Sequence, residues 1–365
     1  MSVVRALGRC VAWTPSGQRL GRLPFAVPVP VPRPAGVLWL AWRRHRAVYR
    51  TVLVVAALAA LWAVWEHHQL TAAVHDDVRT CRRMADVCRA DPSGSVVSPS
   101  HEWGTVRLLF DQVPSVLRFL PLAVAALVGA PLFAQDMENG THRLAWTQSV
   151  GRREWAAAKL ATALTVTATA AIVLTGPVTW WWYTSWRGEH TGGLDGYVWR
   201  TTASWDDWSF FPYVGPAAVA HLLLALMIGA ATGMLLRRTL AAVAVAAIVS
   251  EGAQLALAAA RPHLLATHVQ RGTGLHFPVP PMDSWYLDGG LVRTDGSLTD
   301  SYPSCAPRVG FDACLQTHGL VGQYSRSLHI DELPLLQLVE TGICLAAAAA
   351  LIAFCLWYVP RIAAR

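Results

Sequence analysis

The sequence predicts an all-α integral membrane protein with six transmembrane helices. Hydrophobic residues make up 54% of the 365 residues and charged residues only 15%, a balance that soluble domains seldom show. Six separate stretches reach the roughly 20 apolar residues that a helix needs to cross a bilayer core of ~30 Å. Polar segments, both short and long, separate these stretches.

Residues 1–36 form a proline-rich arm ahead of the apolar stretches. The arm contains no continuous apolar core of the signal-peptide type. Pro28, Pro30 and Pro32 alternate with valine, which favours an extended, disordered arm in the cytoplasm. The next residues, Val37–Arg50, mix aromatic residues with arginine, a pattern that suits either a helix at the membrane surface or the flank of the first span.

The apolar stretches define one transmembrane domain over residues 37–365. We expect transmembrane helices at 47–65, 113–133, 161–186, 210–236, 239–260 and 335–359. We expect extracellular loops at 66–112, 187–209 and 261–334, the last being a long loop between the fifth and sixth helices. In the fourth span Gly229 and Gly233 lie four residues apart, and small residues at that spacing let helices approach closely.

The distribution of charge orients this topology. An even number of spans places both termini on one side, and arginine-rich ends make that side the cytoplasm. Segments assigned to the cytoplasm hold 17 basic and 3 acidic residues, whereas those assigned outside hold 12 and 18. The net charge of +7 therefore reads as a membrane-sorting signal, and we expect no nucleic-acid partner.

Four cysteines fall in the segments assigned outside. Cys81 and Cys88 share the first loop, and Cys305 and Cys314 share the last. Pairing within each loop predicts two disulfides, which an oxidising compartment permits. The sequence has no CxxC spacing, so we expect no metal site.

A polar segment, Asp136–Leu160, joins the second and third spans. It begins with Asp136 and Glu138, breaks at Gly140 and Thr141, and ends with basic residues. This order of charges suits the dipole of a short helix. We interpret the segment as an amphipathic element that leaves the membrane and returns.

This segment resembles the first cytoplasmic loop of ABC-2-type ABC transporter permeases, which carry an acidic, Gly-Thr, basic pattern between their second and third spans. Its run Ala145-Trp146-Thr147-Gln148-Ser149-Val150 resembles permeases of high-GC actinobacteria. The resemblance covers roughly Gly36 to Arg361. It implies a cytoplasmic coupling helix that docks into an ATPase subunit through these residues: Asp136, Glu138, Gly140, Thr141, Trp146, Thr147, Gln148, Arg152 and Arg153.

The resemblance also implies partners. It implies a separate ABC ATPase subunit that binds ATP and Mg²⁺, and a homodimer or heterodimer of permeases surrounded by lipid in a bacterial plasma membrane. Export is the implied direction. The chain itself offers no ATP site, because Lys159, its only lysine, follows three alanines instead of the glycine-rich turn of a Walker A motif. Without an HExxH or GxSxG motif either, we expect no enzyme activity and no cofactor in this chain.

Apart from Arg50 at the inner edge of the first span, three charged residues and one histidine fall inside predicted spans, where a charge costs ~2.5–3.5 kcal/mol on insertion scales. Glu251 lies near the middle of the fifth span, Arg118 and Glu340 near outer ends of two others, and His221 in the fourth. Glu251 either lines a translocation path, carries a proton, or pairs with a neighbouring span. We expect Arg118 and Glu340 to reach the outer surface or to pair there.

Three functions are therefore weighed. The first is the permease subunit of an ABC exporter driven by a separate ATPase. The second is a membrane-bound binding or immunity-type protein that acts without ATP through its outer loops, above all 261–334. The third is a secondary transporter with Glu251 as its proton carrier, although the two halves of the sequence show no inverted repeat.

Overall fold

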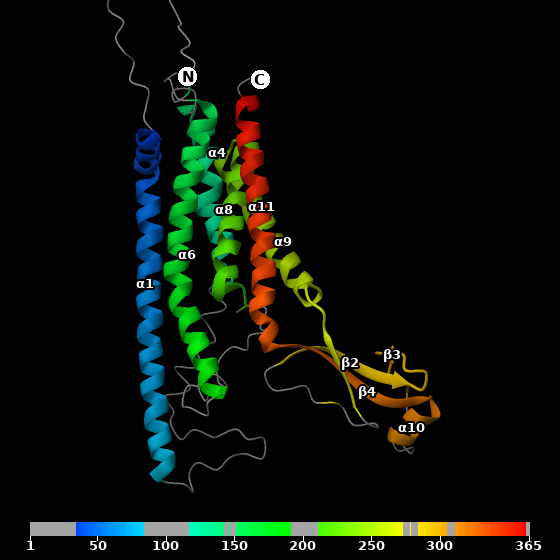
Figure 1. Cartoon of the computed structure of the whole chain (residues 1–365). Coiled ribbons are helices and arrows are strands. Elements are labelled where there is room, and N and C mark those ends of the chain that lie inside the picture. The colour runs from blue at the N-terminus through cyan, green and yellow to red at the C-terminus, as the bar shows by residue number, and fades with distance from the viewer. Residues whose placement is uncertain are drawn as a thin grey trace, which may run out of the picture.

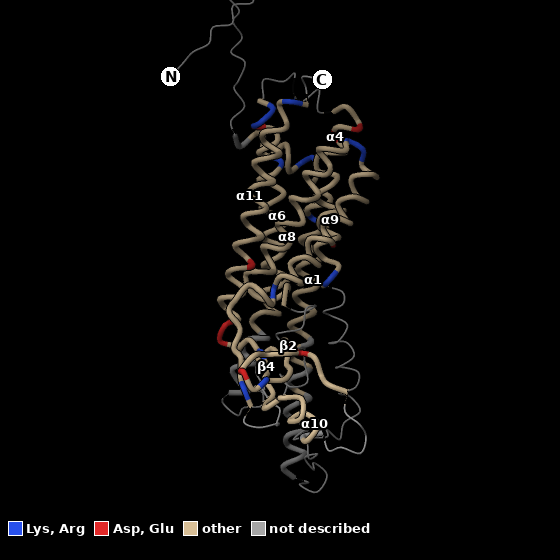
Figure 2. The backbone as a smooth tube through the Cα atoms, turned by 90° about the vertical axis from the view of Figure 1, so that its right-hand side faces the viewer, with Lys and Arg blue, Asp and Glu red and all other residues tan. Residues whose placement is uncertain are grey.

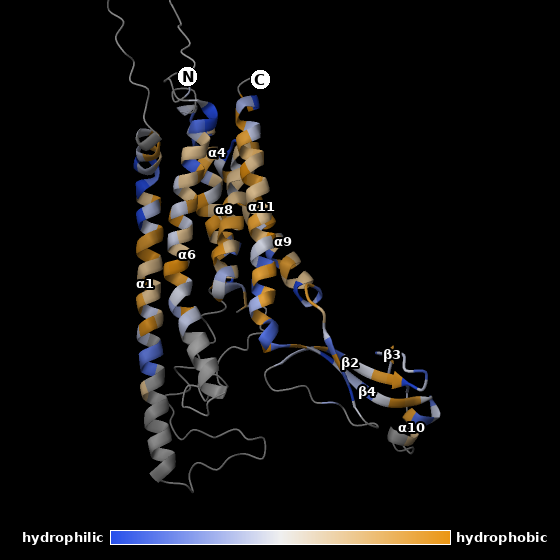
Figure 3. Cartoon of the chain, in the orientation of Figure 1, coloured by the Kyte–Doolittle hydropathy of each residue, from blue (hydrophilic) through white to orange (hydrophobic). Residues whose placement is uncertain are grey.

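The computed structural model describes residues 34–83, 117–141, 146, 151–190, 211–272, 278, 284–304 and 311–362. Within these residues, six helices are long and apolar enough to cross a membrane, at 36–69, 120–138, 152–180, 215–236, 239–263 and 330–362. Apolar residues dominate the middle of the bundle (Figure 3). The predicted all-α membrane protein with six transmembrane helices is thereby confirmed.

The six spans form one elongated bundle with α8 at its centre (Figure 1). The single-helix spans are α1 (Pro34–Arg83), α6 (Arg152–His190), α8 (Gly215–Leu236), α9 (Thr239–Ala260) and α11 (Leu333–Ile362). In α8, 72% of the most apolar stretch is buried, against 17% in α1 and in α9. The apolar side chains of α1 and α9 therefore face outward, as those of helices in contact with lipid do.

The second span changes its helical form midway. The short helix α3 (Leu120–Ala123) leads into a π-helical turn, η1 (Val124–Gly129), and α4 (Ala130–Glu138) completes the span. A π-helical turn inside an α-helix is rare and often marks a functional site. Here the turn lies where the second span packs most closely on α8.

Glycines bring α8 and the second span into backbone contact. A Cβ atom on Gly229 would lie 2.2 Å from the carbonyl oxygen of Ala125, and one on Gly233 would lie 2.2 Å from that of Ala130. A Cβ atom on Gly129 would meet the α8 backbone at 2.5 Å. The close helix approach predicted from the glycine spacing in the fourth span is therefore confirmed.

We expect Gly229→Val to destabilise the bundle by about 1–3 kcal/mol or more, because the added carbons overlap backbone atoms that cannot rotate away. Thermal unfolding of the purified protein in detergent measures the effect. Gly252→Val is the matched control, since nothing lies within 4 Å of a Cβ atom on Gly252. Equal unfolding temperatures for the two variants would contradict the packing described here.

Lysine and arginine gather at the end of the bundle where α1 begins and α11 ends, which we call the basic end (Figure 2). The chain turns there between α8 and α9 within two residues, with Arg237 in the left-handed region at a φ of 57°. The described basic residues at this end are Arg43, Arg44, Arg46, Arg50, Arg152, Arg153, Lys159, Arg237, Arg238 and Arg361.

A four-stranded antiparallel sheet lies beyond the opposite end of the bundle, which we call the sheet end (Figure 1). The strands run in the order β1-β4-β2-β3. They are β1 (His268–Arg271), β2 (Ser284–Arg293), β3 (Leu298–Thr299) and β4 (Leu320–His329), with the helix α10 (Phe311–Thr317) before β4. The segment 261–334, expected as a loop, therefore contains a folded sheet that the sequence reasoning missed.

The sheet is joined to the last span without a flexible connection. β4 passes through the single turn η4 (Ile330–Glu332) into α11. Glu332 accepts a hydrogen bond from the backbone N–H of His329 at 3.0 Å, and its other oxygen pairs with His268 of β1 at 3.0 Å. The side chain of Glu332 thus links both ends of the sheet segment to the start of α11.

The helix α1 also differs from its prediction, because it continues to Arg83. The first outer loop was expected to start at Glu66, so residues 66–83 are helical and Cys81 lies within α1. Val37–Arg50 likewise belongs to the same continuous helix.

Only some cysteines of the two predicted disulfides lie among the described residues. Cys314 is disulfide-bonded, whereas Cys88 and Cys305 lie outside the described residues. The pairings Cys81–Cys88 and Cys305–Cys314 therefore stay predictions. Cys344 and Cys355 are free thiols buried in α11.

Candidate functional site

Asp136, at the basic end, lies at the centre of a buried ionic cluster. Its carboxylate pairs with Arg44 of α1 at 3.0 Å and with Lys159 of α6, and it accepts a hydrogen bond from Thr141 Oγ1 at 3.1 Å. The side chains of Asp136 and Lys159 are only 7% and 3% exposed. Three elements, α1, α4 and α6, are thus joined through one carboxylate.

The surroundings of Lys159 explain why the only lysine of the chain can be buried. Its Nζ donates a second hydrogen bond to the backbone carbonyl of Leu132 at 2.5 Å. The ammonium also lies 5.6 Å from the ring of Phe133 and 5.0 Å from that of Trp155. Aromatic faces attract cations and exclude water, so the carboxylate, the carbonyl oxygen and the two rings together stabilise the buried ammonium.

Glu138 connects the same region to α9. Its Oε2 accepts a hydrogen bond from the backbone N–H of Thr239, the first residue of α9, at 2.8 Å. The first N–H groups of a helix have no partner within the helix, and a carboxylate there also suits the helix dipole. The exposed end of α4 therefore caps α9 across the basic end.

The other described residues of the connection between the second and third spans include aromatic and basic side chains that contact one another. Trp146 packs edge-to-face on Trp155 with ring centroids 6.1 Å apart, and the guanidinium of Arg152 lies 5.0 Å from the Trp146 ring. Arg152 and Arg153 are exposed at the start of α6. Arg152 and Arg153 thus offer a cationic surface next to the edge-to-face contact of Trp146 with Trp155.

The structure shows which of the predicted coupling residues are exposed and which are buried. Asp136, expected to contact an ATPase, is buried and serves as an internal anchor, and Thr141 bonds to it. Glu138, Arg152 and Arg153 do lie at the surface. Gly140 supports the turn after α4 with a φ of 68°, and Thr147 and Gln148 lie outside the described residues.

We expect Lys159→Met to lower the free energy of unfolding by about 3–5 kcal/mol, because it leaves the buried carboxylate of Asp136 with only Arg44 as its cation. The double variant Asp136→Leu with Lys159→Met removes both charges and should recover most of that loss. Arg153→Met, at an exposed position of the same helix, is the control. A single variant as stable as the control would show that the pair does not hold the helices.

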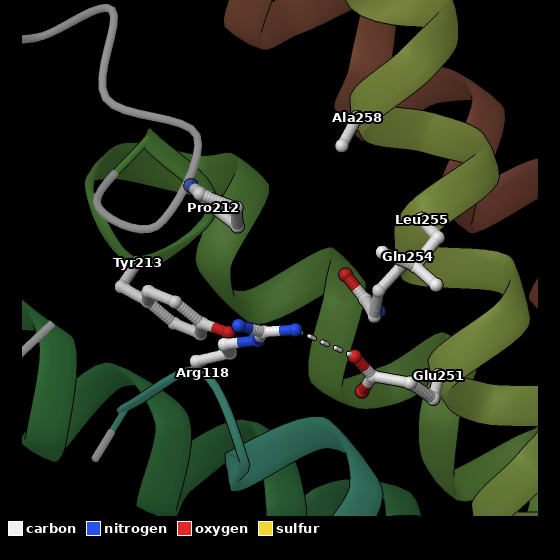
Figure 4. Close-up of a pocket in the computed structure, with 7 residues that line it drawn as sticks. All are labelled: Arg118, Pro212, Tyr213, Glu251, Gln254, Leu255 and Ala258. Atoms are coloured by element: carbon white, nitrogen blue, oxygen red, sulfur yellow. Dashed lines mark hydrogen bonds and ion pairs between the residues drawn. The ribbon is translucent and has the colours of Figure 1, made fainter. Parts of the chain in front are cut away.

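A second polar site lies toward the sheet end, where Arg118 and Glu251 point toward each other across a small pocket (Figure 4). Arg118 Nη2 lies 3.5 Å from Glu251 Oε1. Tyr213 and Gln254 also line the pocket. Of the readings weighed for Glu251, pairing with a neighbouring span is the one that the geometry supports.

Behind this pocket, Glu340 of α11 is fully buried with two partners. Arg261 grips it with two hydrogen bonds of 2.9 Å, and His221 Nε2 lies 2.8 Å from its Oε1. His221 Nδ1 lies 2.7 Å from Gln254 Oε1, so Gln254 belongs to both the pocket and the buried cluster. An ionised carboxylate can only accept hydrogen bonds, so His221 Nε2 is protonated and donates to Glu340.

Sequence reasoning singled out Glu340 and His221 but missed Arg261 and Gln254. Arg261 directly follows the fifth predicted span, where an arginine ordinarily reaches the water. Instead its side chain is 2% exposed and its guanidinium lies 4.1 Å from the ring of Phe211. The available signal was the buried glutamate itself, since a carboxylate inside a span requires a cation. Within the described residues, no group of three His, Cys, Asp or Glu side chains converges to hold a metal ion.

The comparison with protein families decides the assignment. Residues 52–261 match the family model described as ABC-2 membrane transporter related, which is more than half of the 365 residues. The chain belongs to this ABC-2 family. No curated protein and no solved structure matches the chain.

The family match covers one part of the chain and leaves out another. It runs from α1 through α9 and includes Asp136, Lys159 and the pocket residues Arg118 and Glu251. The sheet and α11, with Glu340, follow the matched region. Membership in this family makes the chain a membrane protein of the ABC-2 transporter type.

Proposed function

We propose that this ABC-2 protein is the permease subunit of an exporter and that a separate ATPase subunit drives it. The supporting observation is the connection between the second and third spans. Its Glu138, Arg152 and Arg153 are exposed, and close to them in the chain Asp136 and Lys159 form a buried ion pair that Arg44 joins from α1. ATP and Mg²⁺ would be bound by the partner, since the sequence has no Walker A motif.

The ionic cluster gives this surface a mechanical role. Closure of the ATPase would displace the exposed arginines, which form charge-assisted contacts most readily with acidic groups. Because Asp136 holds α1, α4 and α6 together, a push on the start of α6 would move these elements as a unit. Glu138 would carry the same movement to α9 through its bond to Thr239.

The proposed orientation of the bundle in the membrane rests on the distribution of its basic residues. The basic end would face the cytoplasm, since basic residues near the ends of spans are retained there. The sheet would then face outside, where the disulfide at Cys314 suits an oxidising compartment. A substrate leaving the bundle would meet the pocket of Arg118 and Glu251 on that side.

One observation favours a different role for the sheet. A folded sheet joined directly to α11 is a suitable surface for a ligand or protein outside the cell, as an ATP-independent binding protein would need. The secondary-transporter alternative has less support, because Arg118 holds the carboxylate of Glu251 in an ion pair and a freely titrating proton carrier would need that pair to open.

We expect Arg152→Ala with Arg153→Ala to weaken binding of the ATPase subunit at least about tenfold, because hydrogen bonds to charged groups contribute ~1.5–3 kcal/mol. Transport should fall while the unfolding temperature stays unchanged, since both side chains are exposed. Arg361→Ala, at the basic end of α11, is the control. Binding and transport equal to those of the control would rule out this surface as the ATPase contact.

We expect the topology to appear in cysteine labelling of intact cells. A membrane-impermeant maleimide should label Thr294→Cys, which lies exposed beside the sheet, and should reach Arg153→Cys only after permeabilisation. The unsubstituted protein measures the background from its native cysteines. Labelling of Arg153→Cys from outside would place the basic end away from any cytoplasmic ATPase.

A further inference from the structure

An apolar groove of about 480 Å³ runs between α1, α6 and the second span. On the second span it is lined by the π-helical turn through Val124, Leu127 and Val128. On α1 the lining residues repeat along one face of the helix: Ala47, Val48, Thr51, Val52, Val55 and Ala56. Almost all of the lining is hydrocarbon, so the groove offers nothing that would hold water in a bilayer.

The length of the groove matches one leaflet. From Ala47 to Ala56 the helix rises about 13 Å, and half of a bilayer core measures about 15 Å. The groove starts near the basic end, because Ala47 lies less than one turn beyond Arg44 in α1. A single alkyl chain reaching inward from the membrane surface would fit this depth.

The mouth of the groove is cationic. Arg44 lies on the same face of α1 as Val48 and Thr51, four and seven residues before them, and its side chain is 47% exposed although it pairs with Asp136. That single carboxylate faces two cations, Arg44 and Lys159. Among the described residues the cluster therefore carries an excess positive charge at the end of an apolar channel.

We propose that the groove binds one acyl chain of an anionic phospholipid from the leaflet at the basic end, with the lipid phosphate against Arg44. Basic residues between helices at the membrane surface recognise anionic head groups, and a bidentate guanidinium suits a phosphate. A second copy of the chain is a poorer occupant, because an apolar helix face would bring no anion to offset the excess positive charge of Arg44 and Lys159 over Asp136. The lipid would fill the space between α1 and the π-helical turn and would brace α1 on the rest of the bundle.

Native mass spectrometry of the detergent-purified full chain tests the proposal. Phosphatidylglycerol and phosphatidylcholine with identical acyl chains are added in turn, and retained lipid is counted. We expect phosphatidylglycerol to be retained about fivefold more tightly, which is the preference that one arginine provides. The same lipid should raise the unfolding temperature, and Arg44→Gln should remove the preference between the two head groups.

Variants of two neighbouring valines distinguish lipid bound in the groove from lipid that merely surrounds the protein. Val55 lines the groove and Val54 does not, yet the two are 58% and 55% exposed. Val55→Trp should fill the groove and abolish retention of the lipid, whereas Val54→Trp should leave it unchanged. Equal retention in both variants, or no preference between head groups, would overturn the proposal. So would a change of oligomeric state in Val55→Trp alone, which would make the groove an interface between copies.

Discussion

The buried pair of Asp136 and Lys159 is the interaction on which the bundle depends most. A lone charge in a dry interior is very costly, and a salt bridge there is tolerated only when further hydrogen bonds satisfy both partners. Leu132, Thr141 and Arg44 supply those bonds. Because each partner sits on a different element, the pair fixes how far α4 can slide along α6 and α1. An apolar contact would allow such sliding at little cost, since lipid tails and side chains are alike in polarity.

A second layer of this kind lies toward the sheet end. Glu340 joins α11 to Arg261 and His221, and therefore to the end of α9 and to α8. Between the two polar layers the helices meet through small residues, where Gly229 brings α8 into backbone contact with the π-helical turn. The two layers set the register of the helices, and the glycines set their separation. The bundle is thus held by polar contacts toward both ends and by close backbone contact of α8 with the second span between them.

The sequence could predict what depends on local composition. Hydropathy located all six spans, because each helix satisfies its own backbone within one continuous stretch. It could not place Asp136, since a carboxylate next to a polar loop looks exposed until Arg44 and Lys159, 92 and 23 residues away, are brought to it. The sheet could not be predicted from the sequence for the same reason. His268 of β1 pairs with Ser327 of β4, and pairing between such distant strands leaves only a weak signal in either one.

The helix α9 connects the two polar layers, so a movement at one end of it would reach the other. Its first N–H group is capped by Glu138 at the basic end, while Glu251 and Gln254 lie on the same helix and Arg261 directly follows it. A helix of 22 residues is a rigid rod about 33 Å long, so a displacement of its capped end tilts or shifts the far end as well. The residues that would feel this shift are those that close the pocket and hold Glu340. The ion pair of Arg118 and Glu251 at 3.5 Å is weaker than the two hydrogen bonds that Arg261 donates to Glu340. A shift of α9 would therefore separate Arg118 from Glu251 first and leave the buried cluster of Glu340 intact.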